Sequence, residues 1–408
     1  MNKVKLNEIC QFLNGYAFKS KQYVDDGIRI IRIANVQKGK IIDDAPCFYP
    51  SNTINEIEKY LLSENDLLIS LTGNVGRVGL LTRDMLPAAL NQRVSCIRIL
   101  NKNVVFFKYL YYYLQQNAFE RDCIKASNGV AQLNLSTKWL ENYQIFLPSL
   151  EEQQLIVTKI EELFSKLDKG VEELNKIKEQ LKIYRQAVLK EAFEGNFLLP
   201  KRIPQYDLLE KFIEKPRYGT SKKCSYENDN STPVYRIPNI NIQDNTINQE
   251  DLKFAKFDES EFESLALQEG DVLIIRSNGS VSLVGRAAII RKQDLSGLFA
   301  GYLMRLRICD FSKINPKYLI HFLNSHEART YIEQTAKSTS GVNNINSSEI
   351  CALKVPIFTL DEQNAIIREI ESRLSVCEKV EQTVNQSLQK SESLRQSILK
   401  QAFEGKLV

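Results

Sequence analysis

The sequence predicts an α+β protein in which two similar domains alternate with two long helices that pair as an antiparallel coiled coil. The first observation is a repeat: "RQAVLKEAFEG" at Arg185–Gly195 returns as "RQSILKQAFEG" at Arg395–Gly405, 210 positions later. The second is that about 45 residues around each copy have one apolar stripe with helical spacing. The third is that short β-branched runs separated by Gly, Asn and Asp fill the rest of both halves, which indicates short strands.

Composition bounds the class of protein before any motif is considered. With 408 residues, 43% hydrophobic and 25% charged, the chain has material for more than one globular core. The net charge of +4 permits an anionic partner without requiring one. Eight cysteines without a C-x-x-C pair indicate reduced core thiols, and neither a signal peptide nor a run of roughly 18 apolar residues is present. We therefore expect a cytoplasmic protein without a membrane partner.

The first domain is expected over residues 1–149. Its strand blocks include "IIRIANVQKGKI" from Ile30 and "ENDLLISLTGNVGRVGLL" from Glu64, and a helix is expected around "YLYYYL" from Tyr109. The glycines of "TGNVGRVG" lack the G-x-x-x-x-G-K-[ST] arrangement that holds phosphate, so this stretch is interpreted as a tight connection between strands. "DAPCFYP" from Asp44 departs from the adenine methyltransferase motif and is interpreted as a loop.

The first helical region is expected over 150–198 and the second over 359–408. Each should form one helix of about 45 residues, about 65 Å long at 1.5 Å per residue. Each closes on "FEG", where glycine suits the left-handed residue that ends a helix. A helix with one apolar stripe needs a partner, and the other copy has the matching pattern. The alternative is that each helix packs only on its own domain.

The second domain is expected over 199–358 and repeats the blocks of the first. "VYRIPNINIQDNTI" from Val234 corresponds to the first strand block, and "EGDVLIIRSNGSVSLVGRAAII" from Glu269 corresponds to the second. "YLIHFL" from Tyr318 corresponds to the tyrosine-rich helix, whereas "GYAFKS" of the first half has only a loose counterpart in "RYGTSKK". The two halves therefore share architecture and differ in detail, which implies a pseudo-twofold relation between them.

No catalytic constellation is visible in the sequence. The two histidines, His321 and His326, are five apart on an expected helix, which puts them on different faces rather than together as metal ligands. Paired carboxylates are frequent on the long helices, where they usually form a solvated face. We expect no catalytic residue and no metal site.

Both domains carry polar and aromatic residues suited to nucleic acid, because Arg, Asn and Gln can read bases and Lys can contact phosphates. The candidates in the first domain are Tyr16, Lys19, Lys21, Asn74, Arg77, Gln92, Arg93, Asn128, Gln132 and Asn134. The candidates in the second domain are Tyr218, Lys222, Lys223, Arg276, Asn278, Arg286, Tyr302, Lys337, Asn343 and Asn344. Two non-identical readers held apart by a rod would suit an asymmetric, two-part DNA site.

The chain resembles the specificity subunit (HsdS) of type I restriction-modification systems. The resemblance rests on "LPSLEEQQLIVTKIEEL" from Leu147, "FTLDEQNAIIREIE" from Phe358 and the two "QAFEG" phrases. "GIRIIRIANVQKGKI", "ENDLLISLTGNVG", "GVAQLNLS" and "GVNNINSSEI" resemble blocks of that family's target recognition domains. The resemblance covers essentially the whole chain.

The resemblance implies a DNA sequence-recognition subunit that selects a site and catalyses nothing itself. Each target recognition domain would read one half of a bipartite DNA site, and the helices would set the spacer. In such a complex two modification subunits bring S-adenosylmethionine for adenine methylation. Two restriction subunits can add cleavage driven by ATP and Mg²⁺, so this chain would bind no cofactor. Two other interpretations stay open: a coiled-coil scaffold without DNA specificity, and a self-sufficient enzyme with an unfamiliar active site.

Overall fold

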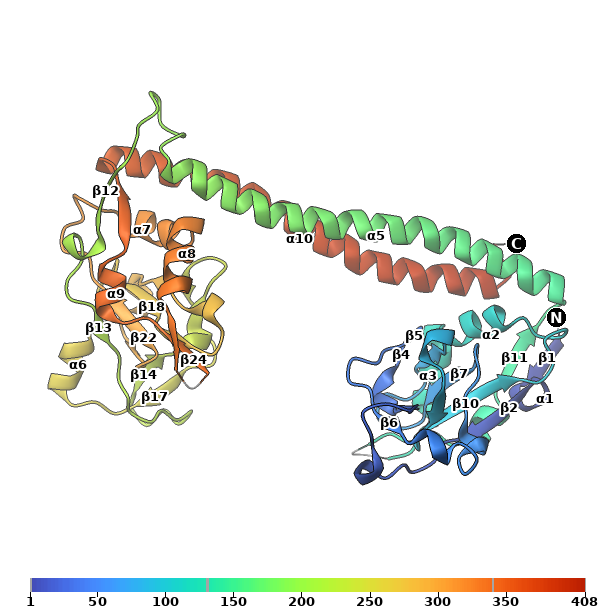
Figure 1. The fold of residues 1–408 in the computed structure, drawn as a ribbon. Helices are drawn as coiled ribbons and strands as arrows, with labels where there is room; N and C mark the ends of the chain where they lie inside the picture. The colour runs from blue at the N-terminus through green and yellow to red at the C-terminus, as the bar shows by residue number, and fades with distance from the viewer. Residues whose placement is uncertain (1, 130–131, 340, 408) are drawn as a thin grey trace. The chain divides into compact units, whose positions relative to one another are not determined.

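The computed structural model describes residues 2–129, 132–339 and 341–407. The chain divides into two compact units. Unit 1 comprises Met1–Leu174 and Asn385–Val408, and unit 2 comprises Asn175–Val384. Each unit therefore holds one globular domain and part of both long helices, α5 (Leu150–Phe193) and α10 (Leu360–Phe403) (Figure 1).

The domain of unit 1, domain 1, is built on an antiparallel sheet with the strand order β2-β10-β7-β8. A smaller sheet has the order β6-β3-β9, and β1-β11 and β4-β5 form two further pairs. The strands are β1 (Asn2–Lys5), β2 (Cys10–Asn14), β3 (Ile28–Ile31), β4 (Val36–Gln37), β5 (Lys40–Ile41), β6 (Phe48–Tyr49), β7 (Leu67–Ser70), β8 (Val78–Leu80), β9 (Ala88–Leu90), β10 (Val94–Ile99) and β11 (Gln144–Leu147). The helices are α1 (Leu6–Ile9), α2 (Phe107–Leu114), α3 (Asn117–Ala126) and α4 (Thr137–Glu141).

The domain of unit 2, domain 2, repeats this plan. Its strand orders β13-β22-β18-β20, β17-β14-β21, β12-β25 and β15-β16 correspond one by one to the four arrangements of domain 1, and β19-β24-β23 is added. The strands are β12 (Gln205–Leu208), β13 (Arg217–Tyr218), β14 (Thr232–Tyr235), β15 (Ile240–Asn241), β16 (Thr246–Ile247), β17 (Lys253–Ala255), β18 (Val272–Ile275), β19 (Ser277–Asn278), β20 (Ala287–Ile289), β21 (Leu298–Phe299), β22 (Leu303–Leu306), β23 (Lys337–Thr339), β24 (Val342–Asn344) and β25 (Lys354–Ile357). The helices are α6 (Glu259–Leu265), α7 (Pro316–Leu323), α8 (His326–Thr335) and α9 (Ser347–Cys351).

The central strand of each main sheet is buried on both faces. In β7, Leu67 and Ile69 pack with Leu110 of α2, whereas Leu68 packs with Leu90 of the smaller sheet. Because side chains alternate across a strand, one short apolar run serves two parts of the core. The "DVLII" run that forms β18 separates two clusters of domain 2 in the same way. The expected α+β class is thus confirmed in both halves.

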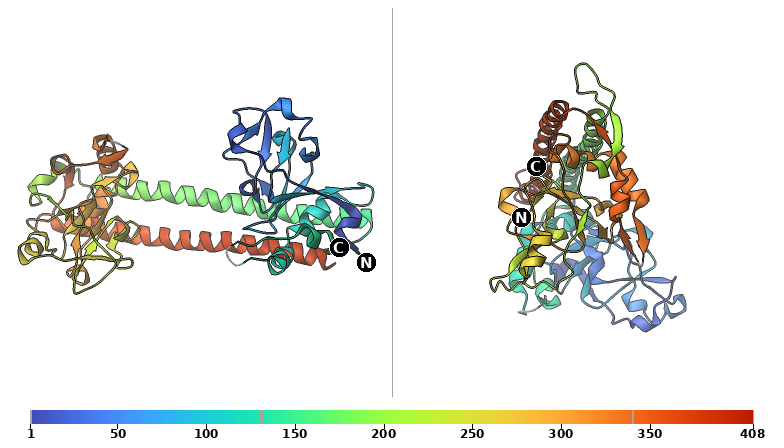
Figure 2. Two further views of the ribbon diagram at one scale, coloured as in Figure 1. Left: turned by 90° about the horizontal axis from the view of Figure 1, so that it is seen from below. Right: turned by 90° about the vertical axis from the view of Figure 1, so that its left-hand side faces the viewer.

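Within each unit the two long helices run side by side in opposite directions (Figure 1, Figure 2). In unit 1, Ile160 and Phe164 of α5 share a cluster with Ile398 and Ala402 of α10. In unit 2, the Arg185 guanidinium lies 2.7 Å from the Glu381 carboxylate, which joins the same two helices. The antiparallel pairing that the repeat predicted is confirmed, and the alternative of helices packed only on their own domains is wrong.

Each domain is held by the start of one long helix and the end of the other. Gln153, near the start of α5, is fully buried against domain 1, and its counterpart Gln363 is fully buried against domain 2. At the opposite ends, Phe403 of α10 packs edge-on against Tyr109 of domain 1, and Phe193 of α5 packs the same way against α7 of domain 2. The chain thus passes from one domain to the other and returns, and both "AFEG" phrases serve as docking ends.

The helix ends agree with the sequence, since Gly195 has φ +75° and Gly405 has φ +71°. Two expectations need correction. His321 and His326 do not share one helix, because the chain turns between α7 and α8. "DAPCFYP" is not entirely a loop, because two of its residues form β6.

Within the described residues, no helix combines the length and the apolar character that crossing a membrane requires.

Candidate nucleic-acid interface

In domain 1 most of the candidate residues lie along one edge of the main sheet. The end of β2, the beginning of β10 and the end of β7 meet there, because neighbouring strands are antiparallel. We call this border the first edge; it comprises residues 14–16, 71–74, 91–93, 128–129 and 132–134. Its backbone is stabilised by hydrogen bonds from the Gln92 N–H to the Tyr16 carbonyl (2.8 Å) and from the Leu71 N–H to the Arg93 carbonyl (2.9 Å).

Two groups of candidate side chains lie on the first edge. Asn134 lies opposite both Thr72 and Asn128 in bridge pairs, and the Gly73 N–H donates to the Leu133 carbonyl at 2.9 Å. The exposed candidates of this group are Asn74, Asn128, Gln132 and Asn134. The second group comprises Tyr16, Gln92 and Arg93, all exposed. Arg93 has φ +72°, so this turn is tight although the residue is not glycine.

Three candidates of domain 1 lie elsewhere. Arg77 is partly buried, and its guanidinium donates to the side-chain oxygen of Gln37 at 2.8 Å, which points to a structural role. Lys19 and Lys21 are exposed on the short 3₁₀ turn around Ser20–Gln22 that follows the edge. Their position suits contact with a charged backbone rather than with base edges.

Domain 2 has a matching border, the second edge, which comprises residues 218–220, 276–278, 300–302 and 343–345. The Gly301 N–H donates to the Thr220 carbonyl (2.7 Å), and the Arg276 N–H donates to the Tyr302 carbonyl (2.9 Å). These two bonds repeat the pair given above for the first edge. A third also recurs, since the amides of Leu135 and Ile345 donate to the carbonyls of Leu71 and Arg276 at 2.7 and 2.9 Å.

The shared hydrogen bonds identify equivalent positions in the two domains. Leu71 corresponds to Arg276, and Arg93 corresponds to Tyr302. Tyr16 corresponds to Thr220, so "GYAFKS" and the "GTSKK" part of "RYGTSKK" occupy the same place in the fold. The backbone of the edge is kept while its side chains change.

The side chains of the second edge centre on Arg276. Its guanidinium carbon lies 4.4 Å from the centre of the Tyr218 ring, and one terminal nitrogen donates to the Gly301 carbonyl at 3.0 Å. Tyr302 is 63% exposed beside this stack, so its ring is free for contact. Asn343 donates to the Gly279 carbonyl at 2.9 Å, which fixes the strands β19 and β24 that carry Asn278, Asn343 and Asn344.

The other candidates of domain 2 differ in accessibility. Lys222 and Lys223 are exposed on the segment that follows the edge. Arg286 is partly buried, donates to the Asn324 side chain at 2.7 Å, and has its pKa lowered by burial, so we assign it to the domain's interior. Lys337 lies in β23, but its side chain is outside the part of the chain that is described.

The structure adds two cations that the sequence analysis did not select. Arg236 and Lys253 line a cavity of about 690 Å³ together with Tyr218, Arg276 and Tyr302. The signal was present, because Arg236 lies in the block "VYRIPN" that repeats "IIRIAN". In the sequence alone, this repetition indicates only that the two halves share a fold.

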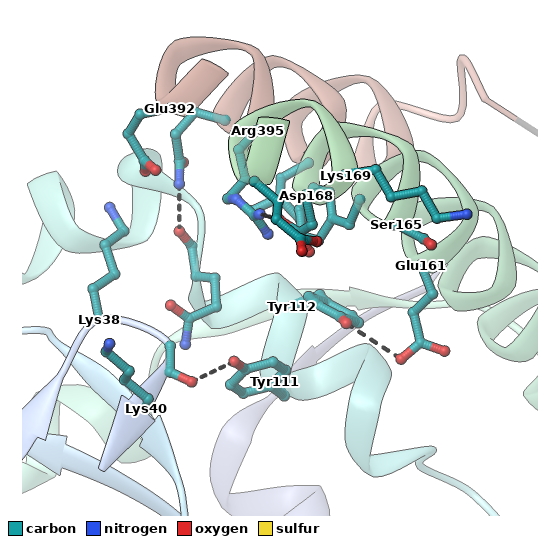
Figure 3. A pocket seen from close by; sticks show the side chains of 16 residues that line it. Lys38, Lys40, Tyr111, Tyr112, Glu161, Ser165, Asp168, Lys169, Glu392 and Arg395 are labelled. Atoms are coloured by element: carbon teal, nitrogen blue, oxygen red, sulfur yellow. Dashed lines mark hydrogen bonds and ion pairs between the residues drawn. The ribbon is translucent and has the colours of Figure 1, made fainter. Parts of the chain in front are cut away.

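A larger cavity of about 1110 Å³ lies in unit 1 where the β4–β5 turn and α2 face the long helices (Figure 3). Charges of both signs line it, including Lys40, Lys169, Glu172 and Glu392. Within its lining the Tyr111 hydroxyl donates a hydrogen bond to the Gly39 carbonyl, and the Arg395–Asp168 ion pair joins α10 to α5 (Figure 3). We interpret it as the space left between domain 1 and the parts of α5 and α10 that pack against it.

Among the described residues no cluster of His, Cys, Asp or Glu has the geometry of a metal site. Burial lowers the pKa of His321 to about 4, so this histidine is neutral inside domain 2 near neutral pH. The exposed side chains at the two edges carry hydrogen-bonding and charged groups, so they can recognise a ligand of matching chemistry.

The fold and the two edges define a class of protein: a duplicated module of one domain and one long helix, with a variable polar border on each domain. Residues 1–182 match the family model described as "Type I restriction modification DNA specificity domain". The type I restriction enzyme EcoKI specificity subunit of Escherichia coli (strain K12) is 28% identical over 415 residues, which cover 98% of this chain and 88% of that protein. The StySPI specificity subunit of Salmonella potsdam is also 28% identical, with coverages of 100% and 91%.

Solved structures show the same fold. A chain from a study of complex assembly and conformational transition in a type I R-M system superposes with a TM-score of 0.72 at 18% identity, covering 99% of this chain and 98% of that one. The HsdS subunit from Thermoanaerobacter tengcongensis gives 0.54 at 17% identity, with coverages of 99% and 97%. The comparisons agree with the resemblance in the sequence: over nearly its whole length the chain is similar to type I restriction enzyme specificity subunits, and residues 1–182 match the DNA specificity domain of that family.

Proposed function

We propose that this chain is the DNA sequence-recognition subunit of a type I restriction-modification complex. Each edge reads one half of an asymmetric, two-part DNA site. The observation that carries the proposal is that one hydrogen-bonded edge is built twice with different side chains. A scaffold without DNA specificity has no need for two such borders that differ at Leu71 and Arg276, or at Arg93 and Tyr302.

The side chains suit base reading. Arg93 on the first edge can donate two hydrogen bonds to guanine, and Gln92, Gln132 and Asn134 can pair with adenine. On the second edge Asn278, Asn343 and Asn344 can pair with adenine in the same way. The lysines beside each edge, Lys21 and Lys223 among them, would contact phosphates and add affinity that falls with salt.

The remaining roles follow from the assembly of such complexes. The paired helices would set the distance between the half-sites and dock two modification subunits, which would bring S-adenosylmethionine and methylate adenine. Restriction subunits that use ATP and Mg²⁺ would join where the system has them. This chain would work in the cytoplasm and catalyse no step.

The test is to map methylated adenines across the genome in cells that carry this chain with its neighbouring methyltransferase subunit. We expect one split motif, two short half-sites with a fixed gap, which disappears when the chain is deleted. Methylation that is unchanged by the deletion would contradict the proposal and favour the scaffold interpretation, which also predicts no affinity for DNA.

A further inference from the structure

The cavity on the second edge has an unusual concentration of positive charge. Its lining contains Lys222, Arg236, Lys253 and Arg276, and none of its lining residues is Asp or Glu. Two of these cations have carboxylate partners outside the lining, since Lys222 pairs with Glu261 and Arg236 pairs with Asp251. For Arg276 and Lys253 the described residues include no ion-pair partner within 4 Å, although the Asp251 carboxylate that pairs with Arg236 also interacts with the charge of Lys253.

The guanidinium groups in this cavity also keep unused donors. The Nε atoms of Arg236 and Arg276 are buried, and neither has a hydrogen-bond partner within the described residues. A buried donor without an acceptor costs free energy, so both arginines gain from an acceptor-rich ligand that draws their guanidinium groups toward it. The Lys253 ammonium lies 4.7 Å from the centre of the Tyr226 ring, a cation–π contact that holds this side chain at the cavity.

The first edge does not repeat this arrangement. The hydrogen bonds and strand pairings shared by the domains place Phe18, Arg32, Cys47 and Leu71 at the positions of the four cavity cations. Only Arg32 is a cation; its buried Nε, like that of Arg236, has no hydrogen-bond partner within the described residues, so the three missing cations are what distinguishes domain 1. Because the two domains share the same backbone hydrogen bonds and strand pairing, this difference in positive charge comes from the side chains and not from the fold.

We propose that the cavity lined by Arg236, Lys253 and Arg276 is a seat for a phosphate group supplied by the DNA backbone, present in domain 2 and absent from domain 1. Phosphate oxygens are negatively charged acceptors. They match the donors of two arginine guanidinium groups and of a lysine that has no ion-pair partner within 4 Å. The seat would anchor the strand beside the bases that meet Tyr218 and Tyr302. As a phosphate contact positions the duplex without reading it, domain 2 would contribute more of the salt-dependent affinity. The DNA source of the phosphate rests on the proposed function, whereas the phosphate chemistry of the seat does not.

The experiment measures binding of the full-length chain to a non-specific 20-base-pair duplex by fluorescence anisotropy at several KCl concentrations. The test variant combines Arg276→Leu, the residue of domain 1, with Lys253→Gln. Each neutralised phosphate contributes about 0.9 to the slope of log K against log salt, so we expect the slope to fall by about 2 if each cation meets its own phosphate and by about 1 if they share one. The single variant Lys253→Gln, which leaves the Tyr218–Arg276 stack intact, should weaken binding in the same direction.

The matched control is Lys292→Gln with Lys354→Gln, which removes the same charge from exposed positions of domain 2 outside the cavity. A control that lowers the slope as much as the test variant would overturn the seat, because net charge alone would then explain the effect.

A second measurement separates the two sources of phosphate. Titration calorimetry with inorganic pyrophosphate should give binding to the native chain and none to the test variant. Loss of pyrophosphate binding with an unchanged DNA slope would assign the seat to a free phosphate compound and overturn the DNA source. No effect in either experiment would overturn the proposal entirely. The calorimetric result does not depend on base recognition, so it stands or fails separately from the methylation test.

Discussion

At the scale of single residues, one buried amide in each half joins a helix to its domain. The Gln153 side chain accepts from the Phe106 N–H at 2.8 Å and donates to the carbonyls of Val104 and Pro148, each at 2.9 Å. Gln363 makes the same three contacts in domain 2 at 2.8–2.9 Å. A fully buried amide is tolerated here because its hydrogen bonds are made, and the geometry they require fixes the angle at which the helix leaves the domain.

We predict that Gln153→Ala lowers the free energy of unfolding of unit 1 by about 3 kcal/mol, since it leaves one buried backbone N–H and two buried carbonyls without hydrogen-bond partners. Urea denaturation followed by hydrogen exchange should locate the loss in unit 1. The neighbouring Gln154 is exposed, so Gln154→Ala should change the stability by less than about 0.5 kcal/mol. Equal effects of the two changes would contradict the conclusion that the buried Gln153 side chain joins α5 to domain 1.

His321 makes stability depend on pH. Burial is the main cause of its lowered pKa of about 4, the Lys317 charge acts in the same direction, and Glu371 opposes them. The unfolded chain binds this proton at a higher pH, near 6.5. The stability contribution is therefore complete above pH 6.5 and is lost as the pH falls toward 4, by up to about 3 kcal/mol.

The measurement compares unfolding free energies at pH 7 and pH 4.5 for the native chain and for His321→Leu. The native chain should lose more stability than the variant over this interval. His326→Leu, at an exposed position, should behave like the native chain. If all three lose the same amount, the carboxylates and not His321 account for the pH dependence.

The sequence predicted the phrases that contain these residues better than it predicted their roles. The letters "EQ" near the start of each long helix were visible as a repeat. Glutamine is usually exposed on a helix, so the sequence suggests that Gln153 faces solvent, and only the packing of the domain shows that it is buried. The buried partner of Arg98 was invisible for the same reason: Asp66 accepts at 2.6 and 2.9 Å from a strand 32 residues away. Contacts between distant segments leave no local pattern for a single sequence to reveal.

At the scale of elements, the sheet edges explain how one fold can serve two specificities. Backbone hydrogen bonds hold the edge, so side chains on it can change without loss of the sheet. The strand blocks, the helix around each tyrosine run and the turn at "TGNVGRVG" were all predicted from the sequence and are confirmed. The equivalence of Tyr16 and Thr220 was not, because short insertions shift the surrounding blocks and only the ladder of hydrogen bonds restores the register.

We predict that Arg93→Ala relaxes recognition in the half-site read by domain 1 and leaves the other half-site unchanged. One bidentate contact to a base is worth about 1–3 kcal/mol of discrimination. Methylation mapping should show one degenerate position in a single half-site. Arg121→Ala, at an exposed position of α3 that is not part of the first edge, should leave both half-sites unchanged. Relaxation in both half-sites would contradict the assignment of one edge to one half.

At the scale of the whole molecule, two helices with one repeated pattern carry two domains with different borders. The sequence predicted this organisation because a helical stripe of 44 residues is a long, regular signal. The division of the chain into two compact units was harder to predict from the sequence. Both compact units cut through the long helices, since each domain packs against the helix that follows it and against the end of the other one.

If the helices set the spacer, one heptad added to each should lengthen the gap in the DNA site and leave its bases unchanged. Insertions after Leu174 and after Val384 would keep the apolar stripes in register and add about 10 Å, or about three base pairs. Methylation mapping would give the new gap directly. New bases in either half-site, with the gap unchanged, would rule out the helices as the spacer.

The discontinuity of unit 1 has a consequence for synthesis on the ribosome. Unit 2 is continuous and can fold once residue 384 has emerged, whereas unit 1 is complete only when Phe403 of α10 packs against Tyr109, although domain 1 is translated first. At 5–20 residues per second, the roughly 230 residues between Leu174, where the first segment of unit 1 ends, and Phe403 take on the order of 10–45 seconds. During that interval the tyrosine face of α2 has no partner from α10 and is open to chaperones, so a chain truncated just after residue 384 would contain all of unit 2 but an incomplete unit 1.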